Sequence, residues 1–351
     1  MSSPVIINGP HGAERLRFGV LLDHQYSKRD TVSLGDRVAE LIDTAQATRD
    51  LGYDSLFVLH HYIAPLRTLQ PLALLSHLLQ HTGRMQVGTG ILILPMIHPV
   101  HYAEELATID QLSGGRLVLG VGAGYRDTEF DAFGIDRTHR LGRLWEGLEI
   151  IERLWSGESL TFQGKHFQLE DVECSVLPAQ QPRPPIWVGS GGPKTIQKIG
   201  EKGYSWVVSS SAKARWAKGN LASHLEQRAA AGFTGPHTAA LHRDLWLGDD
   251  EQSAFDEVKE HVSASAREYA GFGMDWLQAD FEDRSLKAGL FGSPEEVAAQ
   301  IRDYAEAGFD HFVFRVQWLG LPVERSIAML QRFQDEVVPL LASSPIDVTI
   351  G

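Results

Sequence analysis

The stretch LVLGVGAGYRDTEF, from Leu117 to Phe130, decides between two α/β folds. An apolar run followed by three glycines is typical of the turn that binds a dinucleotide after the first strand of a doubly wound sheet. That turn requires the spacing G-x-G-x-x-G at the start of a helix, whereas Gly120, Gly122 and Gly124 stand only two residues apart. The residues that follow are typical of a loop. The spacing therefore argues against a nicotinamide-binding turn.

Short apolar strands alternate with amphipathic helices along the whole chain, and the stretch above supplies the fourth strand rather than the first. The strands are apolar on both faces, as parallel strands covered on both sides are. Eight strand–helix units predict a (β/α)8 TIM barrel, because a doubly wound sheet usually has fewer units. We expect strands at residues 17–22, 55–59, 85–94, 116–121, 185–189, 205–210, 239–247 and 311–316.

One domain is expected over residues 1–351, because no linker rich in proline, glycine or serine divides the chain. Two segments interrupt the alternation. Residues 159–178 alternate between apolar and polar around Gly164, which predicts a β-hairpin insertion. Residues 270–292 show no clear period, and we expect them to form an active-site loop.

The composition argues against several classes of partner and location. A net charge of −13 disfavours binding to nucleic acid or to an anionic membrane surface. No apolar run approaches the roughly 20 residues of a membrane-spanning helix, and the first residues lack the pattern of a signal peptide. The single cysteine, Cys174, allows no internal disulfide, as is usual in a reducing compartment. We therefore expect a cytoplasmic protein.

Two strand ends that carry glycines are candidate cofactor sites. Barrel active sites lie at the carboxyl ends of the strands, where Gly122 and Gly124 let a flat ring approach the backbone. In IWVGSGGPKT, from Ile186 to Thr195, glycines lead into a helix whose free amides suit a phosphate. The alternative is that both stretches are ordinary glycine-rich turns. Their occurrence in one barrel favours a ring cofactor that carries a phosphate.

Several stretches, in their order along the chain, resemble the bacterial-luciferase-like family of flavin-dependent monooxygenases and related deazaflavin enzymes. The resemblance covers the chain from about Leu16 to Leu341. The fold that it implies is a TIM barrel, which agrees with the eight strand–helix units counted above. It rests on LFVLHHY, on VGTGILILPMIHPVHYAEELATIDQLSGGRLVLGVGAGYRDTEFDAFGID, on RLWEGLEIIERLW, on FQGKHFQL, on PPIWVGSGG and on FGSPEEVAAQIRDYAEAGFDHFVFR.

The resemblance implies roles for individual residues. A non-proline cis peptide is implied at the end of the third strand, under the flavin ring, and a backbone surface for the ring at the end of the fourth. A phosphate site is implied at the start of the helix after the fifth strand. The residues concerned are Gly90 and Ile91, then Gly122, Ala123 and Gly124, and for the phosphate Arg140, Gly192 and Thr195. Gly189, Ser190 and Gly191 are candidates for the same phosphate site because they belong to the glycine-rich turn before this helix.

His60 and His61 follow the second strand, at the rim where catalytic groups of a barrel belong. The resemblance implies a catalytic role for His60, whose imidazole, with a pKa near neutral, would serve as a hydrogen-bond or proton-transfer partner. Strand alternation predicts that only one of the two faces the flavin. The alternative is a hydrogen-bonded structural pair. No metal site is expected, because no H-E-x-x-H or comparable ligand set appears.

Two departures from the family pattern bear on the activity. Luciferases carry a glutamate where this chain has Leu59, and an arginine where it has Ala123. Both departures weaken a claim to luciferase activity and leave other oxygenations open. Aromatic residues are candidates for the substrate pocket, although each is equally compatible with core packing; they are Tyr26, Tyr62, Tyr125 and Trp318.

The resemblance therefore implies a monooxygenase that uses reduced FMN and O2 and inserts one oxygen atom into a small organic substrate through a flavin C4a-(hydro)peroxide. A separate flavin reductase is expected, because no nicotinamide fingerprint is present. Homodimerisation is implied by the family. Two alternatives stay open: hydride transfer with the deazaflavin coenzyme F420, and a non-catalytic flavin-binding protein. The substrate is not specified by these residues.

Overall fold

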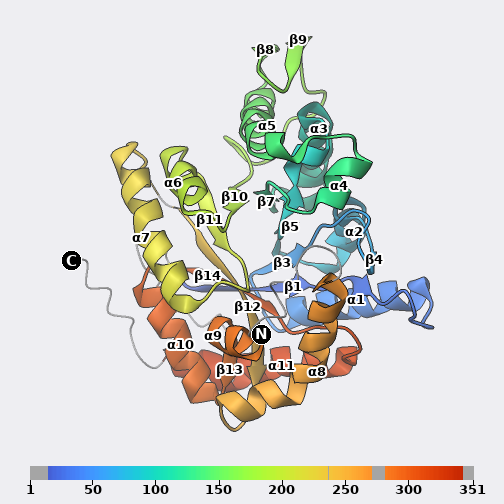
Figure 1. The fold of residues 1–351 in the computed structure, drawn as a ribbon, viewed down its shortest axis with the longest axis vertical. Coiled ribbons are helices and arrows are strands. Elements are labelled where there is room, and N and C mark those ends of the chain that lie inside the picture. The colour runs from blue at the N-terminus through green and yellow to red at the C-terminus, as the bar shows by residue number, and fades with distance from the viewer. Residues whose placement is uncertain (1–14, 236, 271–280, 343–351) are drawn as a thin grey trace.

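The computed structural model describes residues 15–235, 237–270 and 281–342, and within them eight parallel strands close into a barrel (Figure 1). Each strand pairs with its neighbour in the chain, β14 pairs with β1, and the pairing of β10 with β7 completes the ring. The predicted TIM barrel is confirmed. Its strands are β1 (Arg17–Leu22), β3 (Ser55–Val58), β5 (Gln86–Thr89), β7 (Leu117–Gly122), β10 (Ile186–Gly189), β11 (Ser205–Val208), β12 (Ala239–Leu247) and β14 (His311–Arg315).

Helices cover the outside of the barrel (Figure 1). Local signals fix several starts: Ser33 caps the first helix, and Ser293 with Glu296 forms the capping box of α10. The helices are α1 (Leu34–Asp50), α2 (Pro71–Leu78), α3 (Pro99–Ser113), α4 (Asp127–Ala132), α5 (Arg140–Trp155), α6 (Pro193–Glu201), α7 (Ala214–Ala230), α8 (Glu251–Ala270), α9 (Phe281–Ala288), α10 (Pro294–Glu306), α11 (Val323–Arg332) and α12 (Val338–Ala342).

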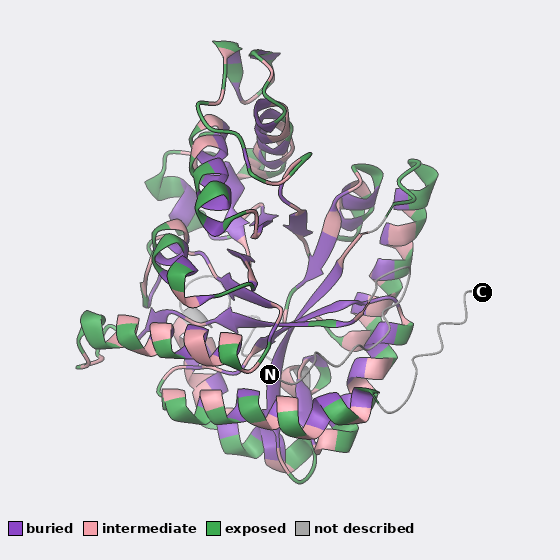
Figure 2. Ribbon diagram, turned by 180° about the vertical axis from the view of Figure 1, so that it is seen from behind, coloured by how far each residue is buried: buried purple, intermediate pink, exposed green. Residues whose placement is uncertain are grey.

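The strands are buried on both faces (Figure 2). One face packs against the helices, and the other fills the barrel with a smaller cluster that includes Leu21, Phe57 and Trp187. The filling is partly polar, since the Ser55 hydroxyl lies 2.7 Å from Nε2 of His311 inside the barrel. A packed floor of this kind leaves ligand space only at the strand ends.

Three segments differ from the prediction. The expected loop after β7 contains helix α4, and the third strand breaks at Gly90–Ile91 into β5 and β6 (Leu92–Ile93). Of the expected loop at 270–292, residues 271–280 lie outside the described residues. The remainder forms α9 and strand β13 (Leu290–Gly292), which pairs with β12.

The hairpin predicted at 159–178 is present as the antiparallel strands β8 (Leu160–Gln163) and β9 (Gln168–Val172), which stand at one end of the molecule (Figure 1). Among the helices of the described ranges, none combines the length and the apolar character that crossing a bilayer requires.

Candidate active site

A cavity opens at the carboxyl ends of the barrel strands. Its volume of about 520 Å³ is within the range of small-molecule binding sites. Strand ends of β3, β5, β7, β10, β11 and β12 contribute to its lining. The residues predicted to bind a cofactor all lie on this one cavity: Gly90, Ile91, Gly122, Ala123, Gly124, Arg140, Gly189, Ser190, Gly191, Gly192 and Thr195.

The glycines of this wall are required first by the packing of neighbouring strands. The Gly90–Ile91 peptide is cis, as the resemblance implied, and the Ile91 side chain lies over β7 and β10. A Cβ at Gly122 would lie 2.6 Å from Ile91 Cδ1, and one at Gly189 would lie 3.3 Å from Ile91 Cγ2. The sequence favours a flat ring against Gly122 and a phosphate near Gly189. At Gly122 the space of the missing side chain is instead filled by Ile91.

The start of α6 forms the anion-binding end of the cavity. Gly192 caps this helix without any side-chain hydrogen bond, and Pro193 holds its first position. The Ser190 hydroxyl accepts a hydrogen bond from the Gly192 amide at 3.1 Å, which fixes the turn. At Gly191 the space around an added Cβ is open. An uncapped helix start in an open turn, with the Thr195 hydroxyl beside it, fits a phosphate group.

His60 lies at the other end of the cavity as a neutral imidazole. The Ile93 amide donates a hydrogen bond to His60 Nδ1 at 3.1 Å, so the ring proton of the neutral form is on Nε2. Within the described part of the chain, this Nε2 is buried without a hydrogen-bond partner. Burial, and secondarily His61, lowers the pKa of His60 to about 3. The expected near-neutral pKa is therefore wrong, and His60 is a hydrogen-bond donor rather than an acid that titrates.

His61 also lines the cavity, against the expectation that only one histidine of the pair faces it. The strand alternation fails here because β3 ends at Val58, so both histidines belong to a loop. Nδ1 of His61 lies 3.1 Å from a carboxylate oxygen of Glu129 on α4.

The segment after β3 is clamped by a buried ion pair of α4 that we had not predicted. Arg126 and Glu129 are both buried and lie 3.2 Å apart. Glu129 accepts the Tyr62 amide at 2.9 Å, and Arg126 donates to the Tyr62 carbonyl oxygen at 3.2 Å. The available signal was the i, i+3 spacing of opposite charges in RDTE. This clamp fixes the loop that carries His60 and His61.

His242 on β12 is a further lining residue that the sequence argument missed. It is buried, and its Nε2 has no hydrogen-bond partner within the described ranges. Its Cε1 lies 2.9 Å from the position of a Cβ added at Gly90. Burial, and then the charges of Arg243 and Arg315, lowers the pKa of His242 to about 4. The alternation of AALHRDLWL placed this polar residue on the inner face and was the available signal.

The four aromatic candidates for the substrate pocket are divided by the structure. Tyr125 lines the cavity described above. The Tyr62 ring lies 4.4 Å from the His60 ring in an edge-on contact and is not part of the lining. Tyr26 and Trp318 instead line a second cavity of about 380 Å³ beside α1. Tyr125 therefore stays a candidate at the first cavity and Tyr26 and Trp318 at the second, whereas Tyr62 belongs to neither lining.

Known proteins resemble the chain over nearly its whole length. It is 26% identical over 341 residues to the oxygenase component of the flavin-dependent trigonelline monooxygenase of Acinetobacter baylyi, covering 88% of this chain and 91% of that one. It is 29% identical over 321 residues to an F420-dependent glucose-6-phosphate dehydrogenase of Kineococcus radiotolerans, covering 86% and 93%. An uncharacterized protein of Sinorhizobium fredii matches at 32% over 184 residues, which span 53% of its length.

The fold comparison agrees. The crystal structure of monooxygenase RslO1 from Streptomyces bottropensis superimposes with a TM-score of 0.82 at 25% identity, covering 93% of this chain and 99% of that one. The family model of the luciferase-like monooxygenases matches residues 16–311. The chain therefore belongs to the luciferase-like monooxygenase family of enzymes.

Proposed function

We propose that this protein is a monooxygenase that uses reduced FMN and O2 to oxygenate a small organic substrate. The observation that carries the proposal is one cavity with a phosphate-type anion site at the start of α6 and a buried neutral donor, His60, at its other end. The similarity to an oxygenase component and to RslO1 supports it. A separate flavin reductase is proposed to supply the reduced cofactor.

The residues present fit this cofactor. When bound, reduced flavin supplies the electrons that activate O2. The α6 amides, Thr195 and Arg140 would bind the phosphate, and the wall formed by Ile91 and the strand glycines would exclude water from one side of the cavity. His60, which lines the cavity, would donate the proton of its unpaired Nε2 in a hydrogen bond, which stabilises negative charge without a proton transfer.

A second candidate function is hydride transfer with F420. It is favoured by the F420-dependent relative, which matches over 86% of this chain. The anion site at α6 does not discriminate between the two cofactors, because both carry a phosphate. The two functions differ in that O2 is a substrate of the monooxygenase reaction and not of the hydride transfer.

Anaerobic titration with reduced FMN and with reduced F420 tests the cofactor. We expect reduced FMN to bind tightly and F420 weakly. The protein is then supplied with reduced FMN, isotopically labelled O2 and a metabolite extract, and mass spectrometry searches for a labelled product. Binding of F420 alone would refute the proposal. Flavin binding with no labelled product from any extract would favour the non-catalytic alternative.

A variant at the anion site tests the phosphate assignment. Thr195→Ala should weaken FMN binding about tenfold, the loss of one hydrogen bond to a charged group, and leave riboflavin binding unchanged. Gln197→Ala, an exposed position on the same helix, is the matched control and should change neither affinity. Equal weakening of FMN and riboflavin by Thr195→Ala would remove the phosphate from this end of the cavity.

A further inference from the structure

The second cavity lies beside the first, between α1 and the segment that joins β14 to α11. Its volume of about 380 Å³ suits a small molecule. Leu21, on the inner face of β1, lines both cavities. The two cavities therefore share the Leu21 side chain as part of their walls. Much of its surface is apolar and comes from Val20, Leu22, Leu41 and Leu321.

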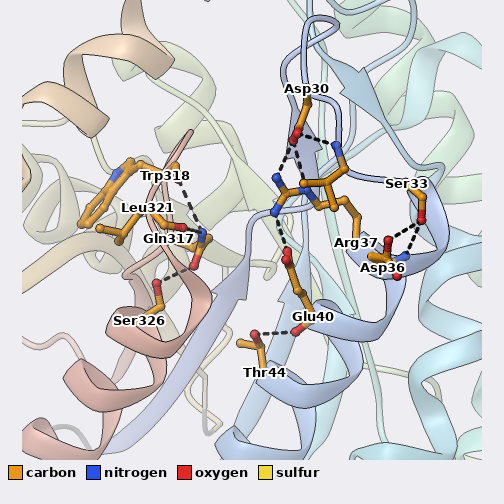
Figure 3. A network of polar contacts seen from close by, with 11 residues as sticks. Asp30, Ser33, Asp36, Arg37, Glu40, Thr44, Gln317, Trp318, Leu321 and Ser326 are labelled. Atoms are coloured by element: carbon orange, nitrogen blue, oxygen red, sulfur yellow. Dashed lines mark hydrogen bonds and ion pairs between the residues drawn. The ribbon is translucent and has the colours of Figure 1, made fainter.

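Two polar groups of the cavity wall are already satisfied (Figure 3). Arg37 donates to Asp30 at 3.0 and 2.5 Å and to Glu40 at 2.6 Å, so its guanidinium is held between two carboxylates. On the opposite side, the Gln317 amide donates to the Leu321 carbonyl oxygen at 2.8 Å. These groups shape the cavity and offer little to a ligand.

Other polar groups are left without partners. The Tyr26 hydroxyl and the Trp318 indole N–H are buried and have no hydrogen-bond partner among the residues that the structure describes. Their side chains are 9% and 1% exposed. Buried polar groups are normally paired, and the two groups differ in what they need: the indole N–H can only donate a hydrogen bond, whereas the Tyr26 hydroxyl oxygen can accept one from a ligand N–H.

The charged side chains among the described lining residues are Asp23, Asp30, Glu40, Arg37 and the exposed Arg29, and Asp23 is the carboxylate that forms no ion pair. Its carboxylate accepts the Gln25 amide at 3.0 Å and makes no salt bridge in the described part of the chain. The guanidinium of Arg315 instead pairs with both carboxylate oxygens of Asp244, at 2.7 and 2.9 Å. Burial raises the pKa of Asp23 to about 6, against the lowering effect of Arg315. A half-buried carboxylate without its own cation favours a cationic ligand.

We propose that the second cavity binds the non-reacting end of the substrate, and that this end is an apolar group carrying a protonated amine which pairs with Asp23. The unpaired hydroxyl oxygen of Tyr26 can accept a further hydrogen bond from such a cation. The assignment of the occupant as substrate rests on the proposed function. The binding of an amine does not, because the cavity is formed by this chain without the flavin.

Calorimetry on the flavin-free protein tests the inference with three matched probes: 2-phenylethylamine, 2-phenylethanol and 3-phenylpropanoate. We expect the amine to bind at least about tenfold more tightly than the alcohol and the acid, since a charge-assisted hydrogen bond is worth roughly 1.5–3 kcal/mol. Asp23→Asn should reduce the amine to the affinity of the alcohol. Asp43→Asn, an exposed carboxylate on α1 outside the cavity lining, is the control and should leave all three affinities unchanged.

The location has its own readout. The amine should quench tryptophan fluorescence, and the quenching should disappear in Trp318→Phe, which keeps an aromatic ring in place. Equal binding of amine and alcohol, or full amine affinity in Asp23→Asn, would overturn the inference. Amine binding by a protein that does not bind FMN would refute the proposed function and leave this site standing. FMN binding without amine binding would refute the amine site and leave the proposed function standing.

Discussion

The His60 imidazole is neutral, and a backbone amide fixes which of its two nitrogens carries the proton. Because the Ile93 amide donates to Nδ1, the neutral ring carries its hydrogen on Nε2, the atom without a partner. His242 is likewise buried and neutral with an unpaired Nε2. Two neutral imidazoles on one cavity stabilise a polar or anionic group by hydrogen bonds and do not require a change of protonation.

His60→Ala should reduce turnover by roughly 10²–10³ and leave the FMN affinity within about twofold, because the lost interaction acts on the reacting group. Steady-state product formation and flavin titration measure the two effects. Since the pKa of His60 is about 3, the wild-type rate should show no inflection from this residue between about pH 5 and 9. His77→Ala, exposed on α2, is the control. An unchanged rate in His60→Ala would return the residue to a structural role.

Gly120 and Gly191 allow a comparison between a glycine that strand packing requires and one that it does not. A Cβ at Gly120 would lie 1.9 Å from the Thr89 carbonyl oxygen, whereas none of the neighbouring atoms lies within 4 Å of one at Gly191. Gly120→Ala should therefore lower the free energy of unfolding by at least about 1–3 kcal/mol, and Gly191→Ala by less than about 1. Urea unfolding measures both. Equal stability of the two variants would contradict the strand spacing described here.

At the scale of elements, α4 is held in place by its ion pair and in turn holds the loop after β3. Glu129→Gln leaves the buried Arg126 guanidinium without its carboxylate, which we expect to cost about 3–5 kcal/mol locally. Hydrogen exchange at the Tyr62 amide, which donates to Glu129, should accelerate in this variant. Asp127→Asn, which removes an exposed carboxylate from the same helix, should leave the Tyr62 amide protected. Unchanged exchange in Glu129→Gln would show that the loop is held by other contacts.

The elements differ in how far the sequence alone predicts them. The barrel strands and most helices lie within a few residues of their expected positions, because their apolar periods are long and regular. Helix α4 has only six residues, too few for a period, and depends on a charge pair that is visible only in three dimensions. The same limit applies to the site: glycine spacing indicated the cavity wall, but His242 needed the closed barrel to bring β12 beside Gly90.

At the scale of the whole molecule, buried histidines make the fold sensitive to acid. Burial lowers the pKa of His24, His224 and His242 to about 4. It lowers the pKa of His60 to about 3 and holds the pKa of His311 well below its usual value of 6.5. Each of these groups takes up a proton only on unfolding, so its contribution to stability is present above pH 6.5 and is lost as the pH falls toward 4. Burial raises the pKa of Asp23 to about 6 and that of Asp310 to about 7. These two carboxyl groups bind protons more tightly in the folded state, so they oppose the loss of stability in part.

The balance is an uptake of about three protons on unfolding, so the free energy of unfolding should fall by about 4 kcal/mol per pH unit between about pH 6 and 4. Urea unfolding at a series of pH values measures the slope. His224→Phe, at a buried position of α7 outside the cavity lining, should reduce the slope by about one proton. His77→Asn, which is exposed, should not change it. A stability independent of pH in this window would contradict the assignment of neutral buried rings.

Ile91 contacts two neighbouring strands at positions where they carry glycine. Its side chain lies 3.6 and 2.6 Å from the positions of Cβ atoms added at Gly120 and Gly122 on β7, and 3.3 Å from that at Gly189 on β10, so of the three it is at Gly122 that Ile91 itself blocks a side chain. The evolutionary consequence is a coupling between two positions. A side chain larger than hydrogen at position 122 requires the Ile91 side chain either to move or to become smaller, so substitutions at positions 122 and 91 should depend on each other across descendants of a common ancestor.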